Sequence, residues 1–133
     1  MDNLKTLTQK EDIILSDEAL EKFETYRKLI VEWNEKINLT AITDEESMNI
    51  KHFLDCLLLT KTGFFEDDKK VLDVGTGAGF PAIPLKLYNE KLNVTMLDSL
   101  NKRIKFLNIV IDDLNLKNIS AIHGRAEEVG RQE

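Results

Sequence analysis

The stretch VLDVGTGAGFP, residues 71–81, decides how this chain folds. Its first four residues are apolar except for one aspartate and predict a short buried strand, and three glycines follow at alternate positions. Pro81 stands two residues after the last glycine, in a place where the first turn of a helix tolerates proline because that amide has no helical partner. Glycine takes positive φ and puts no Cβ between the main chain and a ligand. Strand, turn and helix start therefore predict a nucleotide-binding corner.

The spacing of the glycines separates the candidate nucleotides. A dinucleotide fingerprint needs a glycine where this chain has Phe80, and a phosphate-binding P-loop needs a Gly-Lys-Ser/Thr that the sequence lacks. Here Asp73 stands two residues before Gly75, and Gly77 and Gly79 follow. A carboxylate at a strand end can receive an ammonium group, which favours a nucleoside that carries an amino acid. S-adenosylmethionine (SAM) is such a ligand; the alternative is a glycine turn that serves only the fold.

Composition places limits on the class of protein. A length of 133 residues with 42% hydrophobic residues predicts about one domain with a real core. The net charge of −6 lacks the basic footprint of a stand-alone nucleic-acid binder, although a local patch can still contact RNA. Cys56 is the only cysteine, so it predicts a reducing compartment and a small buried side chain. Without an apolar run near ~20 residues, no membrane span is expected, and the protein is predicted to be cytoplasmic.

Hydrophobic periodicity predicts helices that alternate with strands in the second half of the chain. The order strand–helix–strand–helix–strand favours an α/β fold with a parallel sheet, in which ligands bind at the carboxyl ends of the strands. Two helices before residue 65 form a helical extension (1–65) ahead of a partial SAM-binding domain (66–133). The expected helices cover about 17–38, 44–63, 82–88 and 99–114, and the expected strands cover 71–74, 93–98 and 119–122.

Polar residues follow the second and third predicted strands. Asp98 ends the second strand, 23 residues after Gly75, where a carboxylate can accept from ribose hydroxyls or else cap the next helix. Ala126 and Glu127 follow the third strand, beside the expected place of the adenine. His52 lies on a helix without other metal-ligating neighbours than Asp55, so we expect a packed or surface histidine and no metal site.

Five segments together resemble the bacterial 16S ribosomal RNA guanine-N7 methyltransferase family, once called glucose-inhibited division protein B. The resemblance implies a Rossmann-like class I SAM-dependent methyltransferase fold and methylation of N7 of a guanosine in the 530 loop (guanosine 527) of 16S rRNA in the small ribosomal subunit. It carries cofactor contacts over to Gly75, Phe80, Ala126 and Glu127, with Asp98 as the ribose partner. The segments are NLTA (38–41), KHFLD (51–55), VLDVGTGAGFPAIP (71–84), LDSLNKRIKFL (97–107) and HGRAEE (123–128).

The resemblance covers the N-terminal portion of that family's domain, which continues through further strands. A fold truncated after three parallel strands is expected to expose a sheet edge and so to self-associate, to exchange elements or to bind SAM weakly. Alternatives are a non-catalytic assembly module and a SAM-dependent methyltransferase of a small molecule. Guanine N7 carries a lone pair and no proton, so no catalytic residue is assigned. Lys102, Arg103 and Lys105 either face RNA phosphates or form a solvated surface.

Overall fold

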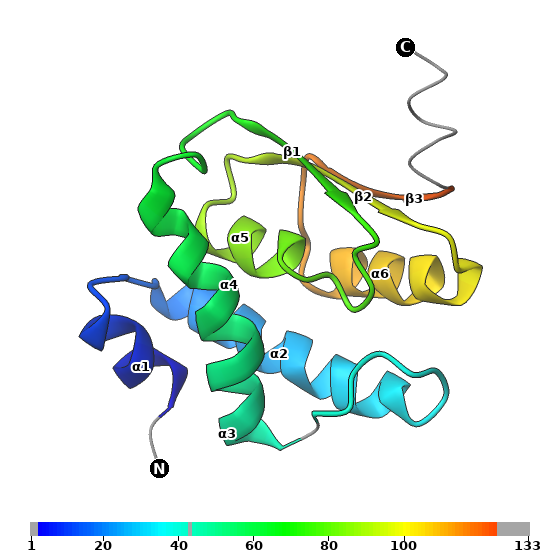
Figure 1. Cartoon of the computed structure of the whole chain (residues 1–133), viewed down its shortest axis with the longest axis horizontal. Coiled ribbons are helices and arrows are strands. Elements are labelled where there is room, and N and C mark those ends of the chain that lie inside the picture. The colour runs from blue at the N-terminus through cyan, green and yellow to red at the C-terminus, as the bar shows by residue number, and fades with distance from the viewer. Residues whose placement is uncertain (1–2, 43, 125–133) are drawn as a thin grey trace.

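The computed structural model describes residues 3–42 and 44–124. Helices fill the first half, and strands alternate with helices in the second half (Figure 1). In chain order the elements are α1 (Leu4–Lys10), α2 (Asp17–Asn34), α3 (Glu45–Met48), the π-helix η1 (Asn49–Leu54), α4 (Asp55–Leu58), the 3-10 helix η2 (Leu59–Thr62), β1 (Lys70–Val74), α5 (Ala82–Tyr88), β2 (Asn93–Asp98), α6 (Asn101–Asp113) and β3 (Ile119–His123).

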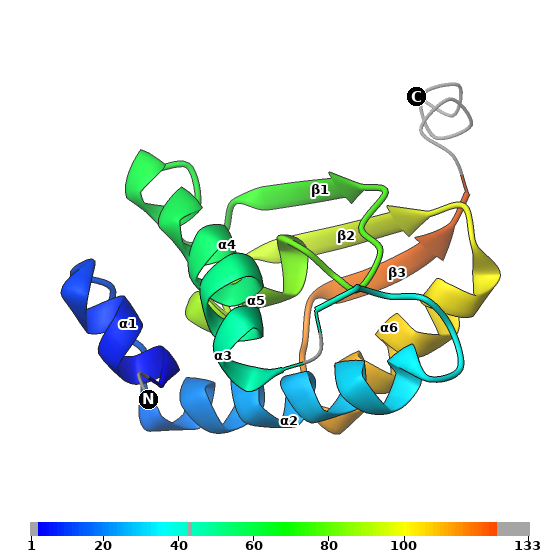
Figure 2. The same ribbon diagram turned by 60° about the horizontal axis from the view of Figure 1, so that its bottom comes forward.

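The three strands form one parallel sheet in the order β1-β2-β3, which confirms the predicted α/β order. In the register, Val74 of β1 lies beside Leu97 of β2, and Leu97 lies beside Ile122 of β3. The strands therefore end together and bring their carboxyl ends to one edge. Helices α2, α5 and α6 lie on the same side of the sheet, as the two views in Figures 1 and 2 agree.

The two faces of the sheet differ in what covers them. Val94 and Met96 point toward the helices and are almost fully buried, as period-two alternation in a strand requires. On the opposite face Leu72, Val74 and Ile122 are 55%, 52% and 45% exposed, and no described helix lies over them. Within residues 3–42 and 44–124, β1 pairs only with β2, so its outer edge is open.

Helix α2 begins as predicted but ends early. Ser16 caps it by accepting from the Ala19 amide, and the helix stops at Asn34 rather than near residue 38. The Asn34 side chain accepts from the Leu39 and Thr40 amides at 2.7 and 2.9 Å. These two bonds hold the segment after Asn34 in a turn. The length of the helix predicted from hydrophobic spacing was therefore too great.

The second predicted helix forms with a changed winding. Asp44 caps it through the Ser47 amide, and Gly63 ends it at φ +81°, as expected of a left-handed terminal glycine. Between these ends, residues 49–54 wind as a π-helix and residues 59–62 as a 3-10 helix. The apolar periodicity of so few residues does not separate these windings from an α-helix, so the sequence prediction missed them.

One cluster of buried side chains joins the helical extension to the sheet. Phe23 and Ile30 of α2 belong to it together with Ile83 and Leu85 of α5. Cys56 is buried as predicted, and burial raises the pKa of its thiol to about 12. A thiol so rarely ionised is a weak nucleophile. The proposed division of the chain near residue 65 stays a prediction.

Lys86 of α5 is a buried charge that the sequence analysis missed. Its side chain is fully buried, and Nζ donates to the carbonyl oxygens of Glu90 and Leu92 at 2.5 and 2.6 Å. Burial lowers the pKa of the ammonium group. The bonds fix the loop that leads from α5 into β2, so this lysine has a structural role. In the described part of the chain, every helix is too short or too polar to cross a bilayer.

Candidate cofactor site at the glycine bend

The bend after β1 exposes main chain without side chains. Gly75 and Gly77 take φ values of +70° and +61°, which L side chains rarely adopt. A Cβ added at either glycine would meet no atom of residues 3–42 and 44–124 within 4 Å. The bend therefore leaves open space at the carboxyl end of β1, where a ligand can approach the backbone closely. This geometry fits the prediction of a nucleoside site at Gly75 and Gly77.

Hydrogen bonds hold the bend against the sheet. The Gly75 amide donates to the Leu97 carbonyl of β2 at 2.8 Å. Asp73 Oδ2 accepts from the Thr76 hydroxyl at 2.8 Å and from the Ala82 amide at 3.2 Å, and burial raises the pKa of this carboxyl. Its other oxygen, Oδ1, has no hydrogen bond among the described residues. One oxygen of Asp73 thus shapes the bend, and a contact of the carboxylate with an ammonium group stays a prediction.

Asp98 lies at the end of β2 with its carboxylate turned into the bend. It is 2% exposed, and Oδ2 accepts from the Gly77 amide while Oδ1 accepts from the Leu100 amide, both at 2.9 Å. The Arg103 guanidinium lies 3.6 Å from Oδ1. The carboxylate therefore stabilises both the bend and the start of α6. Its bond to the Leu100 amide resembles the helix-capping role that the sequence analysis gave as the alternative to ribose binding. A contact with ribose stays a prediction, and it requires the carboxylate to share or exchange these bonds.

Gly79 serves packing rather than ligand access. Its φ is +99°, and an added Cβ would lie 2.5 Å from Ile83 Cδ1 and 3.0 Å from the Tyr26 hydroxyl. Tyr26 is fully buried on α2 and donates its hydroxyl to the Ala78 carbonyl at 2.6 Å. Helix α2 of the helical extension thus supports the bend through this hydrogen bond. The sequence analysis missed Tyr26, because a tyrosine on an amphipathic helix gives no sign of a partner 52 residues away.

Tyr26→Phe is expected to lower the free energy of unfolding by about 1–2 kcal/mol, because it leaves the buried Ala78 carbonyl without its donor. Urea unfolding followed by far-UV circular dichroism measures the change. Tyr88→Phe is the matched control, since Tyr88 is 39% exposed and should change stability little. Equal effects of the two substitutions would contradict the role given to the Tyr26 hydroxyl.

Phe80 packs among aromatic rings from the helical extension. It meets Tyr26 and Phe53 edge-on, at centroid distances of 6.0 and 6.3 Å. The His52 ring stacks on it at 4.5 Å with an interplanar angle of 17°, and His52 Nε2 shares a 2.8 Å hydrogen bond with the Thr40 hydroxyl. His52 is thus a packed histidine, as expected. The segments 38–41 and 51–55, far apart from the glycines in sequence, meet at the bend.

Stability is expected to fall below pH 6.5 through His52. Burial lowers the pKa of its imidazole from 6.5, with a smaller opposing effect of Asp55. As the pH falls, the unfolded state takes up the proton first, so the free energy of unfolding decreases from pH 6.5 down through the folded-state pKa and levels off below it. Urea unfolding from pH 8 to pH 5 measures this decrease. His52→Gln should flatten the profile, and an unchanged profile in His52→Gln would contradict the assignment.

The predicted RNA-binding residues share the first turns of α6. Lys102 and Lys105 are exposed, while Arg103 is partly buried and paired with Asp98. Lys102 and Arg103 also line a hollow of about 350 Å³ together with residues 35–38. Two of the three cations thus face solvent and the third supports the bend. The predicted adenine-side residues Ala126 and Glu127 lie outside the described residues.

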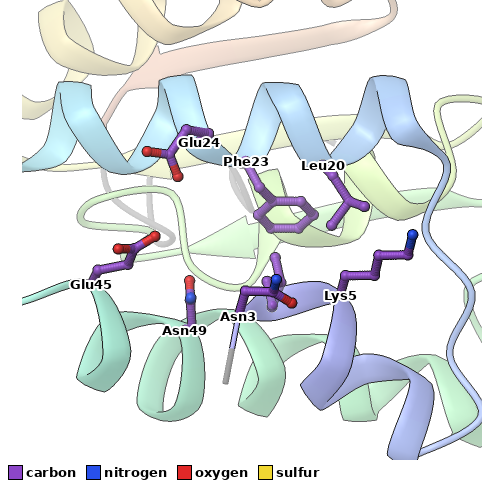
Figure 3. A pocket seen from close by; sticks show the side chains of 8 residues that line it. Asn3, Lys5, Leu20, Phe23, Glu24, Glu45 and Asn49 are labelled. Carbon is purple, nitrogen blue, oxygen red and sulfur yellow. The ribbon is translucent and has the colours of Figure 1, made fainter. Parts of the chain in front are cut away.

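A separate cavity of about 220 Å³ lies between α1, α2, α3 and η1 (Figure 3). Phe23 and Leu20 of α2 point into it, with Glu24, Glu45 and Asn49 around its rim. The two carboxylates ion-pair with Arg27 rather than standing free. The cavity shares no lining residue with the glycine bend, so we assign it no part in the site.

Comparison with curated proteins gives a consistent set of relatives. A family model described as "rRNA small subunit methyltransferase G" matches residues 19–133. A protein of Clostridium botulinum named "Ribosomal RNA small subunit methyltransferase G" is 55% identical over 89% of this chain and 49% of its own length. One of the same name from Alkaliphilus metalliredigens is 48% identical over 98% of this chain and 54% of its own. The chain spans about half the length of these relatives.

Solved structures place the fold among methyltransferases. A protein-L-isoaspartate O-methyltransferase matches with a TM-score of 0.58 and 19% identity, over 92% of this chain and 41% of that one. A SAM-dependent methyltransferase from Aquifex aeolicus matches with a TM-score of 0.50 and 26% identity, over 71% and 47%. The predicted Rossmann-like class I fold is confirmed, and SAM is the cofactor that the family implies. The match over residues 19–133 and the identity to these relatives show that the chain belongs to the family of rRNA small subunit methyltransferase G.

Proposed function

We propose that this chain is the cofactor-binding portion of a SAM-dependent methyltransferase that acts on N7 of guanosine 527 of 16S rRNA, in the small ribosomal subunit of the cytoplasm. One observation carries the proposal: the open glycine bend at the carboxyl end of β1, with Asp98 beside it at the end of β2. Family membership supports the methyl-transfer chemistry and the RNA substrate. The guanosine and its N7 atom come from the resemblance of the five sequence segments.

The chemistry asks little of the protein beyond position. SAM supplies a methyl group already activated by a sulfonium, and guanine N7 offers a lone pair without a proton, so no general base is needed. In the proposal Gly75 and Gly77 admit the nucleoside to the main chain, Asp73 receives the ammonium group and Asp98 receives the ribose. Holding two reactants in line can contribute ~7–11 kcal/mol of the barrier. This division of roles requires no acid–base pair in the site.

Two further sets of contacts belong to the same proposal. Ala126 and Glu127 contact the adenine, and Lys102 and Lys105 contact RNA phosphates from the exposed side of α6. Arg103 acts indirectly in this scheme, since its guanidinium lies against the buried Asp98. Phosphate contacts are expected to orient the RNA without reading its sequence.

Methyl transfer to small ribosomal subunits tests the function. The chain is incubated with radiolabelled SAM and subunits from a strain that lacks the modification, and the labelled position is located by the strand cleavage that N7-methylguanosine permits. Label at one guanosine of the 530 loop supports the proposal. Label at an exocyclic nitrogen or a ribose, or label only in added small molecules, contradicts it. Calorimetry with SAM runs in parallel and reports cofactor binding independently of transfer.

A second candidate function is assembly through the sheet. Leu72, Val74 and Ile122 are exposed on the uncovered face, and the outer edge of β1 is open among the described residues. A second copy of the chain fits this edge, because antiparallel pairing of β1 with β1 about a two-fold axis is self-complementary. Sedimentation equilibrium would show a dimer that Leu72→Lys converts to a monomer. A wild-type chain that stays monomeric at high concentration would contradict assembly.

A further inference from the structure

A hollow of about 350 Å³ opens beside the glycine bend, on the side of the helical extension. Its apolar lining comes from Cys56, Leu59, Phe80 and Pro81, while the remaining lining residues are polar or charged. Binding sites for small ligands occupy about 300–1,000 Å³ and combine an apolar lining with a few polar groups. Because Phe80 follows Gly79 directly, the hollow and the bend share a wall.

The local winding of the chain positions the aromatic wall. His52 lies in the π-helical turn η1 and stacks on Phe80 at 4.5 Å, while its Nε2 is fixed by the Thr40 hydroxyl. Single π-helical turns are rare in proteins, and those that do occur are often found at functional sites. The winding here places a flat, fixed ring next to the bend. Aromatic and apolar side chains of this kind stack against a nucleobase that has left its own stack.

The carboxylate of Asp55, which lines the hollow, complements the hydrogen-bond donors of guanine. Asp55 is exposed, and its carboxylate has no hydrogen bond or ion pair within residues 3–42 and 44–124. Guanine presents two adjacent donors, N1–H and the N2 amino group, and a carboxylate offers two adjacent acceptors. Adenine presents an acceptor at N1, which a carboxylate repels. Lys51 precedes Asp55 by one turn, also lines the hollow, and can meet a phosphate.

We propose that this hollow is the subsite for the substrate guanine, with Asp55 reading its N1–N2 edge and the wall of His52 and Phe80 bounding its ring. N7 lies on the opposite edge of guanine, so a base held in this way leaves N7 free for the methyl group. Lys51 contacts the phosphate of the same or a neighbouring nucleotide. The inference rests on the proposed function and adds to it the residue that selects the base.

Guanosine 5′-monophosphate is the probe. In two-dimensional NMR spectra of the whole chain, guanosine 5′-monophosphate should shift the ring signals of His52 and Phe80. Adenosine 5′-monophosphate should bind at least about tenfold more weakly. Asp55→Asn should raise the dissociation constant for the guanosine nucleotide about ten- to a hundredfold, the range of a lost bidentate pair. Asp112→Asn on α6 is the matched control. The dissociation constant of ribose 5-phosphate measures the affinity that a phosphate at Lys51 contributes without a base.

Three outcomes would overturn the subsite: guanosine monophosphate that shifts residues elsewhere or none at millimolar concentration, equal binding of the adenosine nucleotide, or an Asp55→Asn chain that binds like wild type. A SAM titration separates this failure from failure of the proposed function. Asp55 does not belong to the bend, so Asp55→Asn should bind SAM as wild type does. Equal binding of the guanosine and adenosine nucleotides by the wild-type chain, with SAM binding intact, rejects the subsite alone, whereas absent SAM binding rejects the cofactor site.

Discussion

Gly79→Ala is expected to lower the free energy of unfolding by about 3 kcal/mol. Two costs add at this position. The backbone holds φ at +99°, which is strained for any residue with a Cβ, and the added Cβ would lie 2.5 Å from Ile83 Cδ1. Ile83 is fully buried in the core, so its side chain has little room to withdraw. Because the Tyr26 hydroxyl is the third close atom, the substitution also disturbs the bond that supports the bend.

Gly75→Ala separates the two costs. Gly75 also has positive φ, but a Cβ there meets open space, so only the backbone cost of about 1 kcal/mol is expected. Urea unfolding of both variants measures the difference. If Gly75→Ala destabilised the chain as much as Gly79→Ala, the contact with Ile83 would not explain the effect.

Gly77→Val is expected to weaken SAM binding at least about a hundredfold, or roughly 2.7 kcal/mol. No atom of the described residues lies within 4 Å of a Cβ added at Gly77, and the valine methyl groups would fill this space from the side that the ligand needs. The amide of residue 77 also donates to Asp98, so a changed backbone there would move the carboxylate predicted to receive the ribose. Calorimetric titration with SAM measures the loss.

Gly63→Val is the matched control for this loss. Gly63 has φ +81° and open space around its Cβ position, so the backbone strain resembles that at Gly77, but it ends η2 rather than forming the bend. Unchanged affinity in Gly77→Val would reject the pocket. An equal loss in Gly63→Val would show that lowered stability, rather than a blocked site, explains the result.

The sequence predicted the features that depend on neighbouring residues. Alternating glycines after an apolar strand indicated the bend, and hydrophobic spacing placed helix starts near residues 17 and 44, which the structure confirms. The parallel sheet followed from the order of the elements. These features arise from local backbone preferences and hydrophobic spacing, which a single sequence displays directly.

Features that depend on distant partners were missed. The bond from Tyr26 to Ala78 and the stacking of His52 on Phe80 join segments that only the folded chain brings together. The inward turn of the Asp98 carboxylate depends on where the Gly77 amide points, which the residue types do not reveal. Gly79 shows the same difficulty, since three glycines look equivalent in sequence although two face open space and one faces Ile83.

A crystal structure of the chain grown with SAM tests the central claim most directly. The account predicts the nucleoside against the backbone of Gly75 and Gly77, with its ribose hydroxyls at Asp98. The bond between Asp98 and the Gly77 amide would then be shared or replaced. SAM bound at another place, or a bend whose backbone the cofactor does not touch, would contradict it.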